Sequence, residues 1–278
     1  MTAMCDHDHY ENSDPYLDRG LGFDLETLHE QQSRLRDRRT VLGLMGAGAA
    51  TVGGAVLLGT AGSAAAAVAE IPNETAGPYP GDGSNGPDVL ERSGVVRRDI
   101  RSSFGSSSGT AAGFPFRMVF QLVDAATEKP VSGLALYAWH CTRDGTYSMY
   151  SSGIEDQNYL RGVQVSNAKG KVRFRSIFPG CYSGRWPHVH FEVYRSAKDA
   201  TSGGEILATS QLALPRAECA AVYASQSGYE SSTTNLNRTS ISSDMVFGDD
   251  DGVRQIGTMR GGIAKGYYKA RLVVPVTL

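Results

Sequence analysis

Four side chains that can bind a metal or carry charge lie within nine residues, from position 182 to 190. Tyr182 has a phenol, Arg185 a guanidinium, and His188 and His190 have imidazoles. Apolar and polar residues alternate over residues 186–194, which predicts a strand. Side chains two positions apart on a strand point to the same face, so the two imidazoles should lie side by side. The pattern therefore predicts a histidine pair with a phenol close by.

A second phenol is expected to reach the same place from a loop. Tyr147 lies eight residues after Trp139 and two after Gly145, where the chain can turn back over the sheet end. Two oxygen and two nitrogen donors would then meet: Tyr147, Tyr182, His188 and His190. Free tyrosine has a pKa of about 10, so only a strongly Lewis-acidic cation keeps two phenols ionised at neutral pH. Two phenolates favour a trivalent ion, and Fe(III) fits better than zinc, copper or magnesium.

Each of these residues also has a simpler interpretation when it is taken alone. A His-x-His pair is often structural, a tyrosine is often a core or rim aromatic, and Arg185 could be a solvated charge. Two other hypotheses therefore stay open. One is a secreted, non-catalytic β-sandwich module for adhesion or carbohydrate binding, and the other is a copper or zinc site that uses the His-x-His strand alone. A ferric tyrosinate site would be red-brown, whereas the binding module would be colourless.

The elements that position these residues are predicted to be all-β. Strands are expected over residues 116–122, 134–141, 163–165, 172–174, 186–194, 205–214, 253–259 and 267–276. A short helix is expected over residues 216–223 and a long polar loop over 225–243. Short, closely spaced strands with turns between them are typical of a β-sandwich. With no internal repeat and no second core, residues 70–278 are predicted to form one domain with long loops.

The first 69 residues read as an export leader. Residues 1–33 are polar and acidic, Arg38-Arg39 follows, and residues 41–69 form a run of Leu, Ala, Gly and Val with a small-residue exit. This order is typical of a signal peptide, and the paired arginines indicate the twin-arginine type. A permanent membrane anchor is the alternative, because the run is long enough to span a bilayer. If it is cleaved, the mature chain starts near Ala67 and is extracellular or in the cell envelope.

Charge and cysteine content narrow the function further. The formal net charge of the 278 residues is −2, and no basic face or aromatic-basic interleaving is expected, so a nucleic-acid partner is not predicted. Export would place Cys141, Cys181 and Cys219 in an oxidising space, where one disulfide among them is expected and its pairing stays open.

The combined motif resembles the intradiol ring-cleavage dioxygenases, the family of protocatechuate 3,4-dioxygenase and catechol 1,2-dioxygenase. The resemblance covers roughly residues 74–211 and rests on Trp139, Tyr147, P-G-C-Y at 179–182 and R-W-P-H-V-H-F at 185–191. It implies a β-sandwich of the intradiol dioxygenase type. It also implies a non-haem Fe(III) enzyme that inserts both atoms of O2 into a catechol-type diol and opens the ring to a muconate-type diacid.

The resemblance assigns roles to individual residues. The family's ferric ligands fall on Tyr147, Tyr182, His188 and His190. Tyr182 would be the ligand that dissociates as substrate enters, Arg185 would stabilise developing negative charge, and Gln211 would orient it. Tyr79, in E-T-A-G-P-Y at 74–79, becomes a weaker substrate-binding candidate. The chain lacks the long helical N-terminal segment of the catechol-cleaving branch, so it resembles the protocatechuate-type β subunit more closely, and a homo-oligomer is allowed.

Overall fold

The computed structural model describes residues 68–278. Nearly all of the leader predicted over residues 1–69, with Arg38-Arg39 and Cys5, lies outside the described residues. The export signal and its cleavage therefore stay predictions. Within residues 68–278, no helix has the length and apolar character needed to cross a bilayer.

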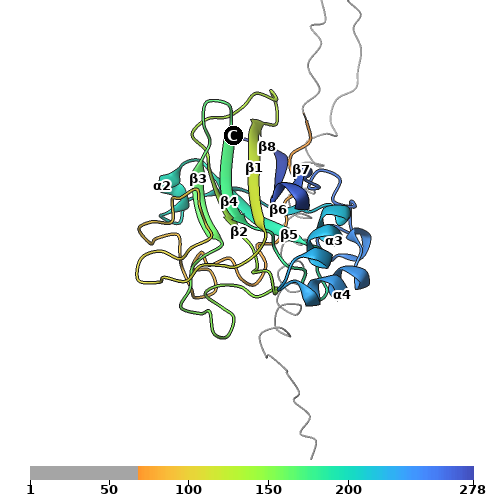
Figure 1. The fold of residues 1–278 in the computed structure, drawn as a ribbon. Coiled ribbons are helices and arrows are strands. Elements are labelled where there is room, and N and C mark those ends of the chain that lie inside the picture. Colours follow the sequence, from red (N-terminus) through yellow and green to blue (C-terminus); the bar gives the residue numbers. More distant parts are fainter. Residues whose placement is uncertain (1–67) are drawn as a thin grey trace, which may run out of the picture. The chain divides into compact units, whose positions relative to one another are not determined.

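Two four-stranded sheets form the fold, which confirms the predicted β-sandwich (Figure 1). The first sheet has the order β4-β1-β8-β7 and the second the order β3-β2-β5-β6. The strands are β1 Pro115–Asp124, β2 Ala135–Trp139, β3 Arg161–Val165, β4 Lys171–Ile177, β5 His188–Tyr194, β6 Ile206–Ala213, β7 Thr258–Gly262 and β8 Tyr267–Val276. All neighbours pair antiparallel except β1 and β8, which run parallel at the centre of the first sheet.

The main core lies between the two sheets because each strand turns its apolar side chains inward. Along β1, Phe116, Met118 and Phe120 are buried, whereas the intervening Arg117 is exposed. Phe120 reaches Phe191 of β5 across the interface, with ring centroids 5.1 Å apart. Burying such side chains contributes about 1.5–3 kcal/mol each, so this period-two pattern is what holds the sheets together.

The second sheet is covered on both faces. Every residue of β5 is buried, including the polar ones that point away from the intersheet core. On that outer face, Tyr137 and Trp139 of β2 belong to a second apolar cluster, which also includes Val89 and Tyr147 from the covering loops. This loop-covered face is where the polar side chains of β5 lie.

Helices occupy the connections after β5. They are α2 Ala197–Ala200, α3 Arg216–Ser225 and α4 Glu230–Arg238, with the 3-10 helices η1 Ile241–Ser243 and η2 Ile263–Lys265. Figure 1 shows α3 and α4 together on the side of the sandwich opposite α2. The long polar loop predicted over residues 225–243 is therefore wrong, since it contains α4 and η1. The prediction of β8 is confirmed, and β7 lies a few residues later than the expected strand 253–259.

The expected disulfide is not formed. Cys141, Cys181 and Cys219 are buried and unpaired. Cys141 Sγ is directed at the carbonyl oxygen of Gly180 (3.6 Å), and Cys181 Sγ at that of Arg185 (3.5 Å). Burial also raises the pKa of the Cys181 thiol to about 12, so these cysteines act as small core residues.

Candidate metal centre and its surroundings

Strand β5 separates two environments by its alternation. Val189, Phe191 and Val193 belong to the intersheet core. His188 and His190 point to the loop-covered face, and each is no more than 3% exposed. The sheet register aligns Trp139 of β2, His190 and Gln211 of β6 in one row. The Trp139 indole stacks on the His190 ring, with centroids 5.0 Å apart and planes 6° apart, and so fixes the orientation of that imidazole.

Three donor atoms converge at the end of β5. The Nε2 atoms of His188 and His190 lie 2.9 Å apart, and the phenol Oη of Tyr182 lies 3.2 Å from His188 Nε2. Tyr182 comes from the turn before β5 and is half-buried, in contrast to the buried Tyr147. The structure thus brings together the phenol and the two imidazoles that the sequence motif singled out.

The tautomer of His188 is fixed by its other nitrogen. Its Nδ1 lies 2.5 Å from the carbonyl oxygen of Trp186 and must donate the proton, so Nε2 presents a lone pair to the convergence point. This is the usual arrangement of a metal-binding histidine. His140 is a useful contrast, because Cys141 O and Ser176 Oγ occupy both of its ring nitrogens. In His190, by comparison, Nδ1 is buried without a hydrogen bond among the described residues.

Tyr147 completes the set from the loop after β2. Its ring centroid lies 5.9 Å from that of Tyr182 and 6.3 Å from that of His190. Its Oη is buried and makes no hydrogen bond of ordinary geometry with residues 68–278. The ring of Tyr79 packs on Tyr147 at 4.8 Å, which brings the weaker candidate to the same site.

Burial sets the charge of these groups. It lowers the pKa of His188 to about 3, with Arg185 as the next cause, and lowers the pKa of His190 well below its ordinary value. It raises the pKa of Tyr147 well above 10, with the neighbouring Tyr182 as the next cause. The imidazoles are therefore neutral, the form that binds metals, whereas the Tyr147 phenol stays protonated unless a cation compensates for its charge.

Two glycines let the tyrosine-bearing loops approach each other. A Cβ at Gly145, whose φ is +89°, would lie 2.9 Å from Cβ of Tyr182. A Cβ at Gly180 would lie 2.5 Å from the carbonyl oxygen of Arg143. The same turn is held from α4, because Ser232 Oγ accepts from Cys181 N (2.9 Å) and Asn235 Nδ2 donates to Cys181 O (2.8 Å).

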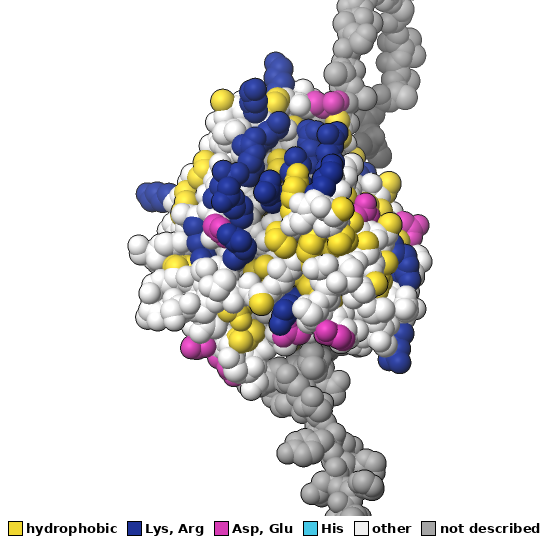
Figure 2. Space-filling model, in the orientation of Figure 1, with side chains coloured by type: hydrophobic (Ala, Val, Ile, Leu, Met, Phe, Trp, Pro, Cys, Tyr) yellow, Lys and Arg dark blue, Asp and Glu magenta, His cyan; other side chains and the backbone are white. Residues whose placement is uncertain are grey.

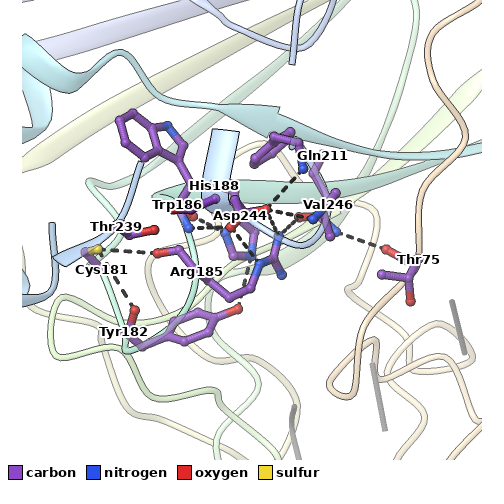
Figure 3. A network of polar contacts seen from close by, with 12 residues as sticks. Thr75, Cys181, Tyr182, Arg185, Trp186, His188, Gln211, Thr239, Asp244 and Val246 are labelled. Atoms are coloured by element: carbon purple, nitrogen blue, oxygen red, sulfur yellow. Dashed lines mark hydrogen bonds and ion pairs between the residues drawn. The ribbon is translucent and has the colours of Figure 1, made fainter. Parts of the chain in front are cut away.

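Arg185 lies in a buried network beside His188 (Figure 3). Its Nη2 donates to Gln211 Oε1 at 2.7 Å, and its Nε donates to Asp244 Oδ2 at 3.0 Å. Gln211 Nε2 in turn donates to the carbonyl oxygen of Thr75 (3.1 Å), which ties the early segment to β6. Arg185 and Gln211, which came from the resemblance, are thus in direct contact.

Asp244 was missed by the sequence analysis. Its carboxylate accepts from Trp186 N (2.6 Å), Val246 N (2.9 Å) and Phe247 N (3.1 Å) in addition to Arg185. Burial opposes its ionisation, but Arg185 and these donors together keep its pKa below the ordinary value. An acid at the start of the otherwise apolar run Met245-Val246-Phe247 was the available signal.

Arg161 was also missed, because nothing in its local sequence marks it. It is 1% exposed, and its guanidinium donates to Tyr79 O and Pro80 O, both at 2.8 Å, and to Ser148 O at 2.9 Å. It therefore connects the Tyr79 segment to the loop that carries Tyr147.

The donor set fits a small, strongly Lewis-acidic cation. Among the described residues, no cluster of three or more His, Cys, Asp or Glu side chains could hold a metal. Two facing imidazole nitrogens 2.9 Å apart and the orphaned phenol of Tyr147 leave polar groups that a central cation would satisfy.

Comparison with known proteins finds similarity over the part of the chain that contains the candidate site. Residues 85–198 match the Dioxygenase family (Dioxygenase_C). The chain is 42% identical over 53 residues to chlorocatechol 1,2-dioxygenase of Rhodococcus opacus, which covers 19% of this chain and 21% of that protein. It is 32% identical over 84 residues to catechol 1,2-dioxygenase 1 of Acinetobacter lwoffii, covering 23% of this chain and 27% of that protein. The matches thus span about a fifth to a quarter of these curated relatives.

The fold extends the likeness over more of the chain. An intradiol ring-cleavage dioxygenase from Tetranychus urticae superposes with a TM-score of 0.56 at 22% identity, covering 67% of this chain and 88% of that chain. Together, these findings show that residues 85–198 are similar to the Dioxygenase family and that the chain shares the fold of an intradiol ring-cleavage dioxygenase.

Proposed function

We propose that this protein is a non-haem Fe(III) dioxygenase that cleaves a catechol-type diol between its two hydroxyl-bearing carbons. The observation that carries the proposal is the convergence of Tyr182 Oη and the Nε2 atoms of His188 and His190 within 3.2 Å beside the buried phenol of Tyr147. O2 would be the second substrate, and a muconate-type diacid the product.

Four residues would hold the iron: Tyr147, Tyr182, His188 and His190. When bound, ferric iron would supply the Lewis acidity that ionises the phenols and activates the diol toward O2. The Trp186 carbonyl keeps His188 Nε2 free of a proton, and the Trp139 indole keeps His190 in position. Both imidazoles are thus prepared as neutral donors before any ligand arrives.

The remaining residues would bind and orient the diol. Tyr182 is the less buried of the two tyrosines, so its Oη would be the group that takes a proton from an incoming hydroxyl. Arg185 is a permanent cation held by Asp244 and Gln211, and it would stabilise negative charge that develops on the substrate. Tyr79, against Tyr147, would border the substrate ring.

Oxygen uptake by the iron-loaded, full-length protein tests the proposal. A panel of catechol, chlorocatechol, hydroxyquinol and protocatechuate is needed, because the motif resembles the protocatechuate type while the curated relatives act on catechols. We expect uptake of one O2 per diol, a ring-opened diacid identified by mass spectrometry, and a red-brown visible band.

Two tyrosine variants separate this proposal from its alternatives. Tyr147→Phe should weaken and shift the visible band, because Tyr182 is then the one remaining phenolate ligand of the proposed set, and should bind less iron. Tyr150→Phe is a matched control, since the Tyr150 phenol bonds to Gly81 N and Asn85. A colourless, metal-free wild type would favour the non-catalytic binding module. Copper or zinc bound equally well by wild type and Tyr147→Phe would favour a site built on the histidines alone.

We further propose that the leader exports the chain by the twin-arginine route. The support is the sequence alone: Arg38-Arg39 before an apolar, small-residue run. Replacing both arginines by lysine should retain the protein in the cytoplasm, as measured by fractionation. Export that is unchanged in this variant would contradict the proposal.

A further inference from the structure

The outer face of the first sheet is strongly basic, so the expectation that the chain has no basic face was wrong. Figure 2 shows Lys and Arg side chains gathered over β4, β1 and β8. We call this the basic face and define it by Arg117, Lys171, Arg173, Arg175, Arg260, Lys269 and Arg271. The two lysines are half-buried and the five arginines are exposed. Lys171, Arg173 and Arg175 alternate along β4, and the other four cations come from β1, β7 and β8.

The sheet register lines these cations up. Arg175, Arg117, Lys269 and Arg260 lie directly opposite one another across all four strands, from β4 through β1 and β8 to β7. Neighbouring strands are about 4.8 Å apart, so four positive charges form a continuous row. A second row contains Arg173 and Arg271, with Val119 between them.

Folding does not account for this arrangement. Like charges directly opposite on neighbouring strands destabilise a sheet. None of the seven cations forms an ion pair with an acid within residues 68–278. Asp99, which pairs with Arg175 at a β-bridge, has its carboxylate occupied by Arg101 at 2.6 Å. The face also belongs to the sheet that does not carry the candidate metal centre.

The face is hollowed rather than flat. One hollow of about 560 Å³ is lined by Val119, Lys171, Arg173, Thr258, Arg260, Lys269 and Arg271. A second hollow of about 220 Å³ adjoins it through Val119, Arg173 and Lys269 and adds Arg98, Arg117 and Arg175. Together they form a basic trough.

We propose that the basic face is a docking surface for a linear acidic polysaccharide that carries carboxylates. Guanidinium groups pair with carboxylates through two parallel hydrogen bonds, and five of the seven cations are arginines. A chain with regularly repeated carboxylates would follow the row of four cations. Docking of this kind is independent of ring cleavage and would hold the enzyme near a polymeric matrix.

Two other polyanions fit less well. Single-stranded nucleic acid needs exposed aromatic rings on which its bases stack, and Tyr267, the ring beside the face, lies under the Arg117 guanidinium at 4.3 Å. A bilayer surface binder needs a set of apolar or aromatic side chains that insert between lipids, whereas this face presents Val273 (44% exposed) and the half-buried Val119. A flexible polymer held mainly by charge remains the best match.

Binding of the full-length protein to polygalacturonate tests the proposal. Wild type should bind at low salt and release as salt rises. The triple variant Arg117→Gln, Arg260→Gln and Lys269→Gln should bind at least tenfold more weakly and with a flatter salt dependence. Because it removes like-charge contacts, the variant should keep or raise the melting temperature, which excludes unfolding as the cause.

A matched control removes the same charge elsewhere. Arg195→Gln, Lys198→Gln and Arg238→Gln changes three exposed cations away from the first sheet and should leave the affinity within twofold of wild type. Absence of wild-type binding, or equal losses in the two triple variants, would overturn the proposal. Tighter binding to duplex DNA or to phosphatidylglycerol vesicles than to polygalacturonate would overturn it in favour of that partner.

Discussion

Replacing Asp244 by asparagine should remove the buried ion pair that holds the Arg185 side chain in place. The carboxylate is fully buried and accepts from the Arg185 guanidinium and from three backbone N–H groups. In Asp244→Asn, one acceptor oxygen becomes an NH2 group that faces donors. The buried guanidinium, whose side chain is 3% exposed, then loses its ion-pair partner.

The structure sets the size of this effect. Removing one partner of a buried ion pair costs about 3–5 kcal/mol, because the other charge is left uncompensated. For a domain of this size, each kcal/mol lowers the melting temperature by about 2–4 °C, so a drop of at least ~6 °C is expected. The pKa of Asp244 is lowered in the folded state, so its stabilisation is present above pH ~4 and is lost as pH falls through the folded pKa. The difference between wild type and variant should therefore shrink in acid.

Two measurements test this prediction. Thermal unfolding at pH 7 and at pH 3 measures the loss of stability, and turnover of the best diol at pH 7 measures the effect on Arg185. The matched control is Asp99→Asn, which breaks an ion pair of 2.6 Å whose side chains are 44% and 42% exposed. Exposed pairs contribute about 0–1 kcal/mol, so this control should melt within a few degrees of wild type. Equal melting shifts in the two variants, or full turnover in Asp244→Asn, would refute the role assigned to the buried pair.

Three further outcomes are expected. Gly145→Ala should weaken iron binding, measured by metal analysis, because its Cβ would press on Tyr182. The control Gly153→Ala has φ +82° and no atom within 4 Å of its Cβ, so it should retain iron. Equal loss of iron in both variants would point to backbone strain alone. Burial raises the pKa of Glu192 from 4.5 to about 7, so wild-type stability should fall as pH rises between these values. In denaturant titrations, Glu192→Gln should show a weaker dependence of stability on pH and roughly 1–3 kcal/mol more stability than wild type at pH 8. Arg161→Lys cannot reproduce the three carbonyl contacts of the guanidinium, so it should lower the free energy of unfolding by about 2–4 kcal/mol in the same titration and raise KM for the diol. An unchanged KM would contradict the positioning role of Arg161.

The residues of the candidate site were largely predictable because they lie in local patterns. A strand's period of two fixes the shared face of His188 and His190 without any tertiary information. The approach of Tyr147 could only be inferred, since it depends on Gly145 and on how two loops pack. Asp244 lies 59 residues from its partner Arg185, and Arg161 lies 13 residues from its partner Ser148. Such partners are found only when the chain is folded.

The fold shows the same division between local and tertiary information. β8 was predictable from its alternation and length, whereas α4 was not, because its sequence E-S-S-T-T-N-L-N-R has poor helix formers. Tertiary contacts stabilise it instead: Leu236 and Ser232 are buried, and Ser232 and Asn235 bond to the Tyr182 turn. The basic face was missed although Lys171, Arg173 and Arg175 alternate locally, because the register is needed to bring Arg117, Arg260 and Lys269 beside them.

The segment around Thr75 limits where the chain can be processed. Val68 N donates to Ala125 O, Ile71 N to Pro275 O and Glu74 N to Thr209 O. The segment is thus hydrogen-bonded to strands or strand ends of both sheets. The carbonyl of Thr75 then completes the hydrogen bonding of Gln211. If the proposed leader is cleaved near residue 67, these hydrogen bonds would all be kept, whereas a cut five to ten residues further on would remove them. Maturation and catalytic competence would then depend on the same few peptide bonds.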